Sequence, residues 1–261
     1  MALHNKGYGP VGCLAKPPVD LLLCFAVKEE MKFFRDPPGG IPMRVKKGVG
    51  AGRKDAANPT VDRSRDAGVT QVWVTGIGRK NAAVNIREAM SKVRPERVIT
   101  AGFAGGLNPA LKVATVIYEE DAGAGFGPEL EKLGVLPAKF YCHRRVATTA
   151  AEKRMLWQQS GADAVEMESS VIRTICHEFQ VPSATVRVIS DDASHDLPLD
   201  FNALMTSEDR LDYVKLLWTI LRRPSRIFRL MEFQQQTLAA ARRLGGVLED
   251  LLRAERRRTD L

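Results

Sequence analysis

The stretch Arg97-Val98-Ile99-Thr100-Ala101-Gly102-Phe103-Ala104-Gly105-Gly106, residues 97–106, decides the fold. It begins as a short apolar run, which is typical of a strand buried on both faces. It ends in a glycine-rich segment, which predicts a tight turn over residues 102–106. Runs of the same kind predict further strands at residues 20–27, 71–78, 114–118, 162–165 and 183–189.

Two segments between these runs, residues 80–93 and 167–179, carry apolar residues at helical spacing. Buried strands that alternate with helices predict a three-layer α/β/α sandwich around a mixed, mainly parallel sheet. In such sheets ligands bind outside the carboxyl ends of the strands, and the motifs described below fall at such ends.

The remaining segments differ in character from this α/β pattern. Residues 36–68 are rich in Gly, Pro, Lys and Arg and predict an exposed loop with one strand near 43–49. From residue 209 onward the pattern is amphipathic and helical, over 211–220, 227–244 and 248–258, with breaks expected at Pro224 and Gly245-Gly246. We therefore expect an N-terminal tail (1–19), an α/β domain (20–205) and a basic amphipathic C-terminal helical extension (206–261).

Composition places the chain among globular proteins. Its 261 residues are 44% hydrophobic and 27% charged, which excludes wholesale disorder. Residues 1–20 lack a signal-peptide pattern, and no apolar stretch reaches the roughly 18 residues of a membrane span. Its four cysteines are widely separated, with no CxxC and no histidine at ligand spacing, so we expect reduced thiols, a cytoplasmic location and no metal site.

The first candidate motif is Glu166-Met167-Glu168, at an expected strand-to-helix junction. Acidic residues in the first turn of a helix are common, because the helix dipole stabilises negative charge there. An ionised glutamate also accepts two hydrogen bonds, which suits the vicinal hydroxyl groups of a ribose. From the motif alone, the first interpretation, a charge in the first turn of a helix, is favoured.

The second motif, residues 186–192, places Ser190 and Asp191 at the end of an apolar strand that contains Arg187. Asp191 fits a turn or helix cap, or a general acid whose surroundings favour its protonated form. A buried guanidinium requires a partner, so Arg187 predicts at least a structural ion pair.

The glycine segment itself is the third motif. It has neither GxGxxG nor GxxxxGK[ST] spacing, so it predicts no dinucleotide or nucleoside triphosphate, and we expect no cofactor. Its glycines permit close approach of backbone N–H groups to a ligand, or simply a tight turn before Leu107.

Taken together, four segments stand in the order and spacing of one family and resemble the nucleoside phosphorylase and methylthioadenosine/S-adenosylhomocysteine nucleosidase superfamily. The resemblance covers roughly residues 20–192 and rests on residues 76–83, 101–107, 164–168 and 181–191. It implies a nucleoside phosphorylase-like fold, a homo-oligomer and a small-molecule purine nucleoside as substrate.

The resemblance also implies roles for single residues. Asp191 would protonate or hydrogen-bond N7 of the departing purine, next to Ser190. Glu168 would bind the ribose hydroxyl groups and stabilise the oxocarbenium-like sugar, Met167 would pack against the ribose, and Glu166 would flank them. The glycine segment would line the substrate site through Phe103, Ala104 and Gly105.

The choice between hydrolysis and phosphorolysis depends on the residues near the nucleophile. Glu30 matches the carboxylate that orients the attacking water in the nucleosidases, and Arg187 matches a residue near that water. A carboxylate repels phosphate, so we expect hydrolysis and the release of adenine. Lys28 keeps a phosphorylase open as an alternative. A non-catalytic nucleoside-binding protein is the second alternative, although both Asp191 and Glu168 are present.

Two departures from the family pattern bear on the substrate. Phe103 replaces a small hydroxyl residue near the water, and residues 145–153 lack the usual Ser-Gly-Asp pattern, which puts the contacts to the base in doubt. The second stretch and residues 210–226 resemble the hopanoid-associated branch, which is thought to remove adenine from adenosylhopane. The resemblance thus implies a 5′-substituted adenosine such as adenosylhopane, methylthioadenosine or S-adenosylhomocysteine.

The charge of the chain is uneven. Lys and Arg number 39 against 31 Asp and Glu, a net charge of +8, and half of that excess lies in residues 208–261. Basic residues that do not interleave with aromatic ones argue against nucleic acid as a partner. Arginines beside Leu221, Ile227 and Phe228 are typical of a solvated helix face, or of a helix that contacts anionic lipid. We therefore expect a cytoplasmic location, with peripheral membrane contact through residues 209–261 as an additional hypothesis.

Overall fold

The computed structural model describes residues 18–34, 46–47, 70–204, 206 and 226–259. Cys13, most of the expected loop at 36–68, the expected helix at 211–220 and Pro224 lie outside these residues. Among the helices that the structure describes, none is long and apolar enough to cross a membrane.

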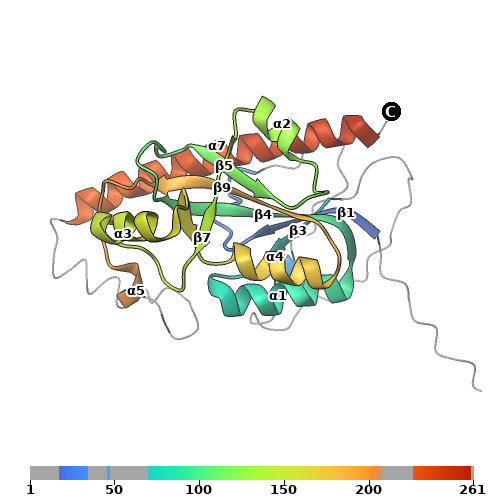
Figure 1. Ribbon diagram of the computed structural model, residues 1–261, viewed down its shortest axis with the longest axis horizontal. Helices are drawn as coiled ribbons and strands as arrows, with labels where there is room; N and C mark the ends of the chain where they lie inside the picture. Colours follow the sequence, from blue (N-terminus) through green and yellow to red (C-terminus); the bar gives the residue numbers. More distant parts are fainter. Residues whose placement is uncertain (1–17, 35–45, 48–69, 205, 207–225, 260–261) are drawn as a thin grey trace, which may run out of the picture.

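A mixed, mainly parallel sheet forms the centre of the molecule (Figure 1). Its strand order is β2-β3-β1-β4-β9-β5-β6. The inner strands β3, β1, β4 and β9 are parallel, and β5 runs antiparallel to β9. The bounds are β1 Pro18–Phe25, β2 Lys46–Lys47, β3 Thr70–Val74, β4 Arg94–Gly106, β5 Val116–Glu120, β6 Leu136–Pro137 and β9 Ser183–Asp191.

Apolar side chains that point alternately to the two faces of the sheet form two hydrophobic cores, one on each face. In β1, Leu21 and Leu23 enter one core, whereas Leu22 and Cys24 enter the other. Because successive side chains of a strand point to opposite faces, a continuous apolar run requires cover on both sides.

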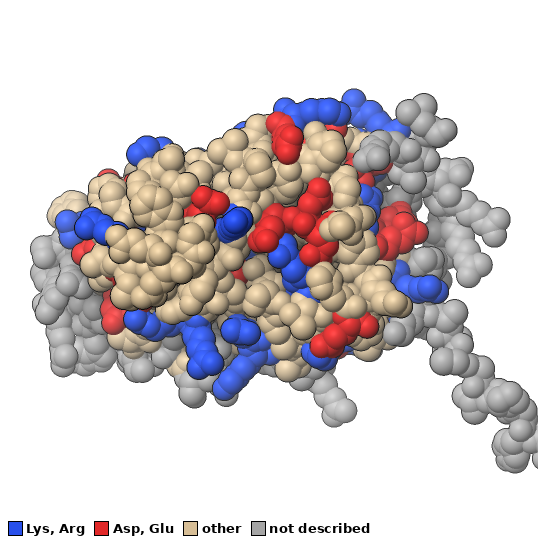
Figure 2. All heavy atoms as spheres, viewed as in Figure 1, with Lys and Arg blue, Asp and Glu red and all other residues tan. Residues whose placement is uncertain are grey.

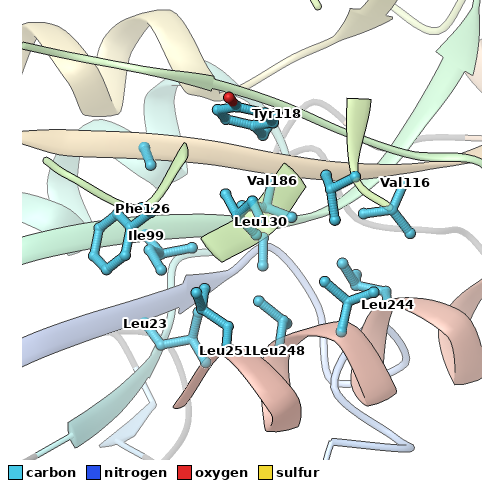
Figure 3. Close-up of a cluster of buried hydrophobic side chains, with 14 of the residues drawn as sticks. Leu23, Ile99, Val116, Tyr118, Phe126, Leu130, Val186, Leu244, Leu248 and Leu251 are labelled. Carbon is cyan, nitrogen blue, oxygen red and sulfur yellow. The ribbon is translucent and has the colours of Figure 1, made fainter. Parts of the chain in front are cut away.

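Helices provide that cover. Helices α1 (Gly78–Lys92) and α4 (Ser169–Glu178) pack on one face, and α7 (Arg226–Thr259) packs on the other (Figure 1). In Figure 3, Leu244, Leu248 and Leu251 of α7 face the sheet residues Leu23 and Ile99. The three-layer α/β/α sandwich is thereby confirmed. Short helices α2 (Gly127–Lys132), α3 (Ala150–Ser160) and α5 (Phe201–Leu204) complete the described helices.

The expected turn over residues 102–106 is wrong: β4 continues through all of these residues. Gly105 and Gly106 pair with the antiparallel strand β8 (Ala164–Glu166), which itself pairs with β7 (Phe140–Cys142). The glycines instead allow two carboxyl side chains to lie close to the backbone of β4. A Cβ on Gly102 would lie 2.4 Å from Oε1 of Glu30, and one on Gly105 would lie 3.2 Å from Oδ2 of Asp191.

The expected break at Gly245-Gly246 is also wrong, since α7 is one continuous helix. A Cβ on Gly245 would lie 2.7 Å from the carbonyl oxygen of Phe33, so this glycine allows the helix to dock against the chain after β1. The second half of α7 belongs to the same core as the sheet, and Arg97 of β4 joins it through a 2.5 Å ion pair with Glu255. The domain limits stay a prediction.

The positive charge does not gather in one place on the face seen in Figure 2. Basic side chains are spread over several parts of that face, with acidic side chains among them. This distribution is that of an ordinary solvated surface, so net charge alone identifies no partner.

Candidate active site

Strand ends bring the expected site residues together at one end of the sheet. Glu30 follows β1, Phe103 lies near the end of β4, Glu166 ends β8 and Asp191 ends β9. The backbone N–H of Phe103 donates to Glu30, and Asp191 lies opposite Gly105 in the β4–β9 register. The candidate site therefore lies at the carboxyl ends of the central parallel strands, where such sheets bind ligands.

Arg187 is buried in β9 and has the partner that its burial requires. Its guanidinium donates to the carbonyl and hydroxyl oxygens of Thr100 at 2.8 and 3.0 Å and pairs with Glu166 at 3.1 Å. Glu166 in turn accepts hydrogen bonds from the backbone N–H of Glu168 and from both the N–H and the hydroxyl of Ser169. Burial opposes the ionisation of Glu166, but Arg187 and these donors outweigh it and hold its pKa below the usual range.

Glu168 has a different environment although it is only two residues away. One of its oxygens accepts a 2.8 Å hydrogen bond from the N–H of Gly78, at the start of α1. Burial, followed by the negative charge of Glu166, raises the pKa of Glu168 to about 7, while Arg187 and Gly78 oppose the shift. Glu168 is thus a carboxyl group that changes charge near neutral pH.

Glu30 connects the ends of β1 and β4. Its Oε2 accepts from the N–H groups of Ala26 and Val27 at 2.8 and 3.0 Å, and its Oε1 accepts from the N–H of Phe103 at 3.0 Å. Burial raises its pKa, partly offset by Arg187 and by these three donors. The carboxyl group is therefore held rigidly and resists ionisation more than an exposed glutamate does.

Asp191 is held through both of its carboxyl oxygens. The hydroxyl of Ser190 donates to Oδ1 at 2.6 Å, and the Lys153 ammonium pairs with Oδ2 at 2.6 Å. Lys153 belongs to α3, and its residue exposure is 0%. Sequence reasoning missed this lysine, although Thr149 and Glu152 have capping-box spacing that indicates a helix start there.

The other expected lining residues lie around these carboxyl groups. Met167 is half-buried between Glu166 and Glu168, and Oγ of Ser190 lies 3.3 Å from the carbonyl oxygen of Ala104. The described residues contain no cluster of three or more His, Cys, Asp or Glu side chains that could hold a metal ion. What the site offers is three carboxyl groups, on Glu30, Glu168 and Asp191, each in different surroundings.

The fold and this set of carboxyl groups define a class of protein. A family model described as the phosphorylase superfamily matches residues 64–128 and 140–222, more than half of the chain. The chain belongs to the phosphorylase superfamily and is an enzyme of that superfamily.

The chain is also similar in sequence to individual proteins that are named as nucleosidases. The 5′-methylthioadenosine/S-adenosylhomocysteine nucleosidase of Staphylococcus aureus (strain JH9) is 26% identical over 176 residues, which cover 55% of this chain and 76% of that protein. The family resemblance is thus confirmed, whereas the hopanoid-associated branch stays a prediction.

Solved structures confirm the fold. The S-adenosylhomocysteine nucleosidase of Streptococcus pyogenes, in complex with 5-methylthiotubericidin, has a TM-score of 0.58 and 16% identity over 93% of this chain and 99% of its own. The futalosine hydrolase of Helicobacter pylori strain 26695 has a TM-score of 0.55 and 15% identity over 90% and 98%.

Proposed function

We propose that this protein hydrolyses the N-glycosidic bond of a purine nucleoside and releases the base. The observation that carries the proposal is the convergence of Glu30, Glu168 and Asp191 at one end of the sheet, each with different hydrogen-bond or ion-pair partners. Relatives named as nucleosidases support hydrolysis as the reaction class.

Two of the carboxyl groups suit the two fragments of the breaking bond. As the bond breaks, positive charge develops on the sugar and negative charge on the base. Glu168, once ionised, accepts hydrogen bonds from the ribose hydroxyl groups and stabilises the cationic sugar. Asp191 protonates or hydrogen-bonds N7 of the purine and so stabilises the leaving base.

Glu30 suits the nucleophile. An ionised carboxyl group has about four lone-pair positions, and three of those on Glu30 are filled by backbone N–H groups. In the ionised form, which Arg187 and the three backbone donors favour against burial, the remaining position can orient a water for attack on the sugar and the negative charge repels phosphate. Arg187 supports the site through Glu166, and its direct contact with the water stays a prediction.

The substrate we propose is a 5′-substituted adenosine that releases adenine. Methylthioadenosine and S-adenosylhomocysteine are the compounds in the names of the relatives, and futalosine is the one in the name of a structural neighbour. Met167 would pack against the ribose, and Phe103, Ala104 and Gly105 would line the pocket beside it. Adenosylhopane stays a prediction from the resemblance of residues 145–153 and 210–226.

Base release distinguishes these possibilities. We would incubate the purified protein with methylthioadenosine, S-adenosylhomocysteine, adenosine, inosine and futalosine, with and without phosphate, and quantify free base by chromatography. Hydrolysis predicts release that is independent of phosphate. Strict dependence on phosphate would establish the phosphorylase alternative, and binding without release would establish the non-catalytic one.

A further inference from the structure

Lys153 lies in the candidate site but has no part in the chemistry proposed above. It is a lysine with a residue exposure of 0%, in the first turn of α3. Lysine is almost never fully buried unless a partner compensates its charge. Its position therefore requires an explanation in terms of what its ammonium group contacts.

The ammonium group has one acceptor for each of its three protons. It pairs with Oδ2 of Asp191 at 2.6 Å and donates to the carbonyl oxygens of Asp192 at 2.7 Å and of His195 at 3.1 Å. Three acceptors match the three donors of a protonated lysine, so the contacts are those of a charged ammonium group. The ion pair is buried, and such pairs are sensitive to the loss of one partner.

The same lysine fastens the chain after β9 to the start of α3. Two further hydrogen bonds join these segments, from the N–H of Leu197 to the carbonyl of Thr148 and from the N–H of Ala150 to Asp196, both at 2.8 Å. Asp191 therefore lies where two segments meet, and the side chains of Lys153 and Asp196 both join them. It also lies in the stretch 145–153 that lacks the family's Ser-Gly-Asp pattern.

We propose that Lys153 is the positioning residue that holds the Asp191 carboxyl group against the leaving base. With Ser190 on one oxygen and Lys153 on the other, the carboxyl group is restricted to one orientation. For this role Asp191 carries a proton on Oδ1, taken up from solvent before the bond breaks, while Oδ2 stays against Lys153. When that proton passes to N7, Asp191 becomes a carboxylate whose charge the Lys153 ammonium compensates. If the carboxyl group is misplaced, this donor loses its effect on the transition state, whereas the rest of the substrate still binds. This inference rests on the proposed function, because it acts through the role of Asp191.

The test is a double-mutant cycle on base release, with Lys153→Met, Asp191→Asn and the double variant. Lys132→Met is the matched control, because Lys132 is an exposed lysine in an ion pair with Glu129. Loss of a positioned acid costs about 10²-fold or more in kcat, so Lys153→Met should show that loss with KM changed by less than about threefold. The double variant should be no slower than Asp191→Asn alone, and Lys153→Arg should retain more activity than Lys153→Met.

Melting temperatures separate a misplaced carboxyl group from a damaged fold. Lys153→Met leaves the Asp191 charge without its partner and should lower the melting temperature, and the double variant, which lacks both charges, should regain part of it. The inference alone would be overturned if Lys153→Met kept the wild-type kcat. It would also be overturned if the double variant were slower than Asp191→Asn by the same factor by which Lys153→Met is slower than the wild type. Failure of the wild-type protein to release any base would instead overturn the proposed function, and this role with it.

Discussion

Glu166 and Glu168 differ in charge behaviour because their immediate partners differ. Glu166 meets the Arg187 guanidinium and three donors, so its charge is compensated. Glu168 is also buried, but it accepts a hydrogen bond from the N–H of Gly78 and lies near the negative charge of Glu166. Carboxyl groups whose surroundings push their pKa values apart are typical of acid–base sites. We therefore expect Glu166 to stabilise the fold and Glu168 to be available to a ligand.

The pKa of Glu168 predicts a pH dependence of ligand binding. Because only the ionised form accepts two hydrogen bonds from a ribose, affinity should be full above pH 7 and fall as pH drops below the pKa of about 7. Titration calorimetry with 5′-methylthiotubercidin, which keeps the ribose hydroxyl groups, measures this. Glu168→Gln should bind weakly and with little pH dependence; a variant that kept the wild-type pH profile would show that another group is responsible.

Glu166 predicts a stability effect. Glu166→Gln leaves the buried Arg187 charge uncompensated, and breaking such a pair costs about 3–5 kcal/mol. Chemical denaturation should show that loss relative to wild type. Glu178→Gln is the control, because Glu178 forms an exposed pair with Arg87 and its loss should cost at most about 1 kcal/mol. Equal stabilities of the two variants would contradict the structural task of Glu166.

At the scale of elements, local sequence patterns predicted the strands but not what the glycines do. Apolar runs such as Leu21–Phe25 report burial directly, and the structure confirms them as strands. Gly102 and Gly245 were expected to mark a turn and a helix end. Both instead allow contact with a segment distant in sequence, with Glu30 and with Phe33 respectively. A local pattern carries no signal for such contacts, and the same holds for the pairing of Lys153 with Asp191.

Two adjacent glycines of α7 predict opposite effects of one substitution. Gly245→Ala places a methyl group 2.7 Å from the carbonyl oxygen of Phe33 and should lower stability by about 1–3 kcal/mol, the cost of overpacking. Gly246→Ala meets nothing within 4 Å and should raise stability by about 0.5–1 kcal/mol, because alanine favours a helix. Thermal unfolding of both variants checks this, and equal shifts would contradict the docking of α7 at Gly245.

At the scale of the whole molecule, the C-terminal helix is a layer of the fold and carries much of one core. Ala240, Leu244, Leu248 and Leu251 are buried against the sheet. The amphipathic pattern of α7 was predictable from sequence, but the choice between a lipid surface and a sheet as the cover of its apolar face was not. Homo-oligomer formation, a cytoplasmic location and peripheral membrane contact stay predictions.

Membrane contact is best tested by point substitutions, because removal of α7 would expose the core. Phe228 and Met231 are 79% and 52% exposed on the first part of this helix. If they enter a lipid surface, Phe228→Ser with Met231→Ser should reduce sedimentation with anionic vesicles at an unchanged melting temperature. Met155→Ser, at another exposed methionine on α3, is the control. Equal recovery of all three proteins would discard the membrane contact.

The central claim, that Asp191 assists departure of a purine in a hydrolytic reaction, is tested most directly by one rate. That rate is adenine release from methylthioadenosine without phosphate, by wild type and by Asp191→Asn. We predict release by the wild type and a loss of about 10²-fold or more in the variant, the usual contribution of a positioned acid. Circular dichroism should show that both proteins are folded. Release only in the presence of phosphate, or an Asp191→Asn variant as fast as the wild type, would contradict the account.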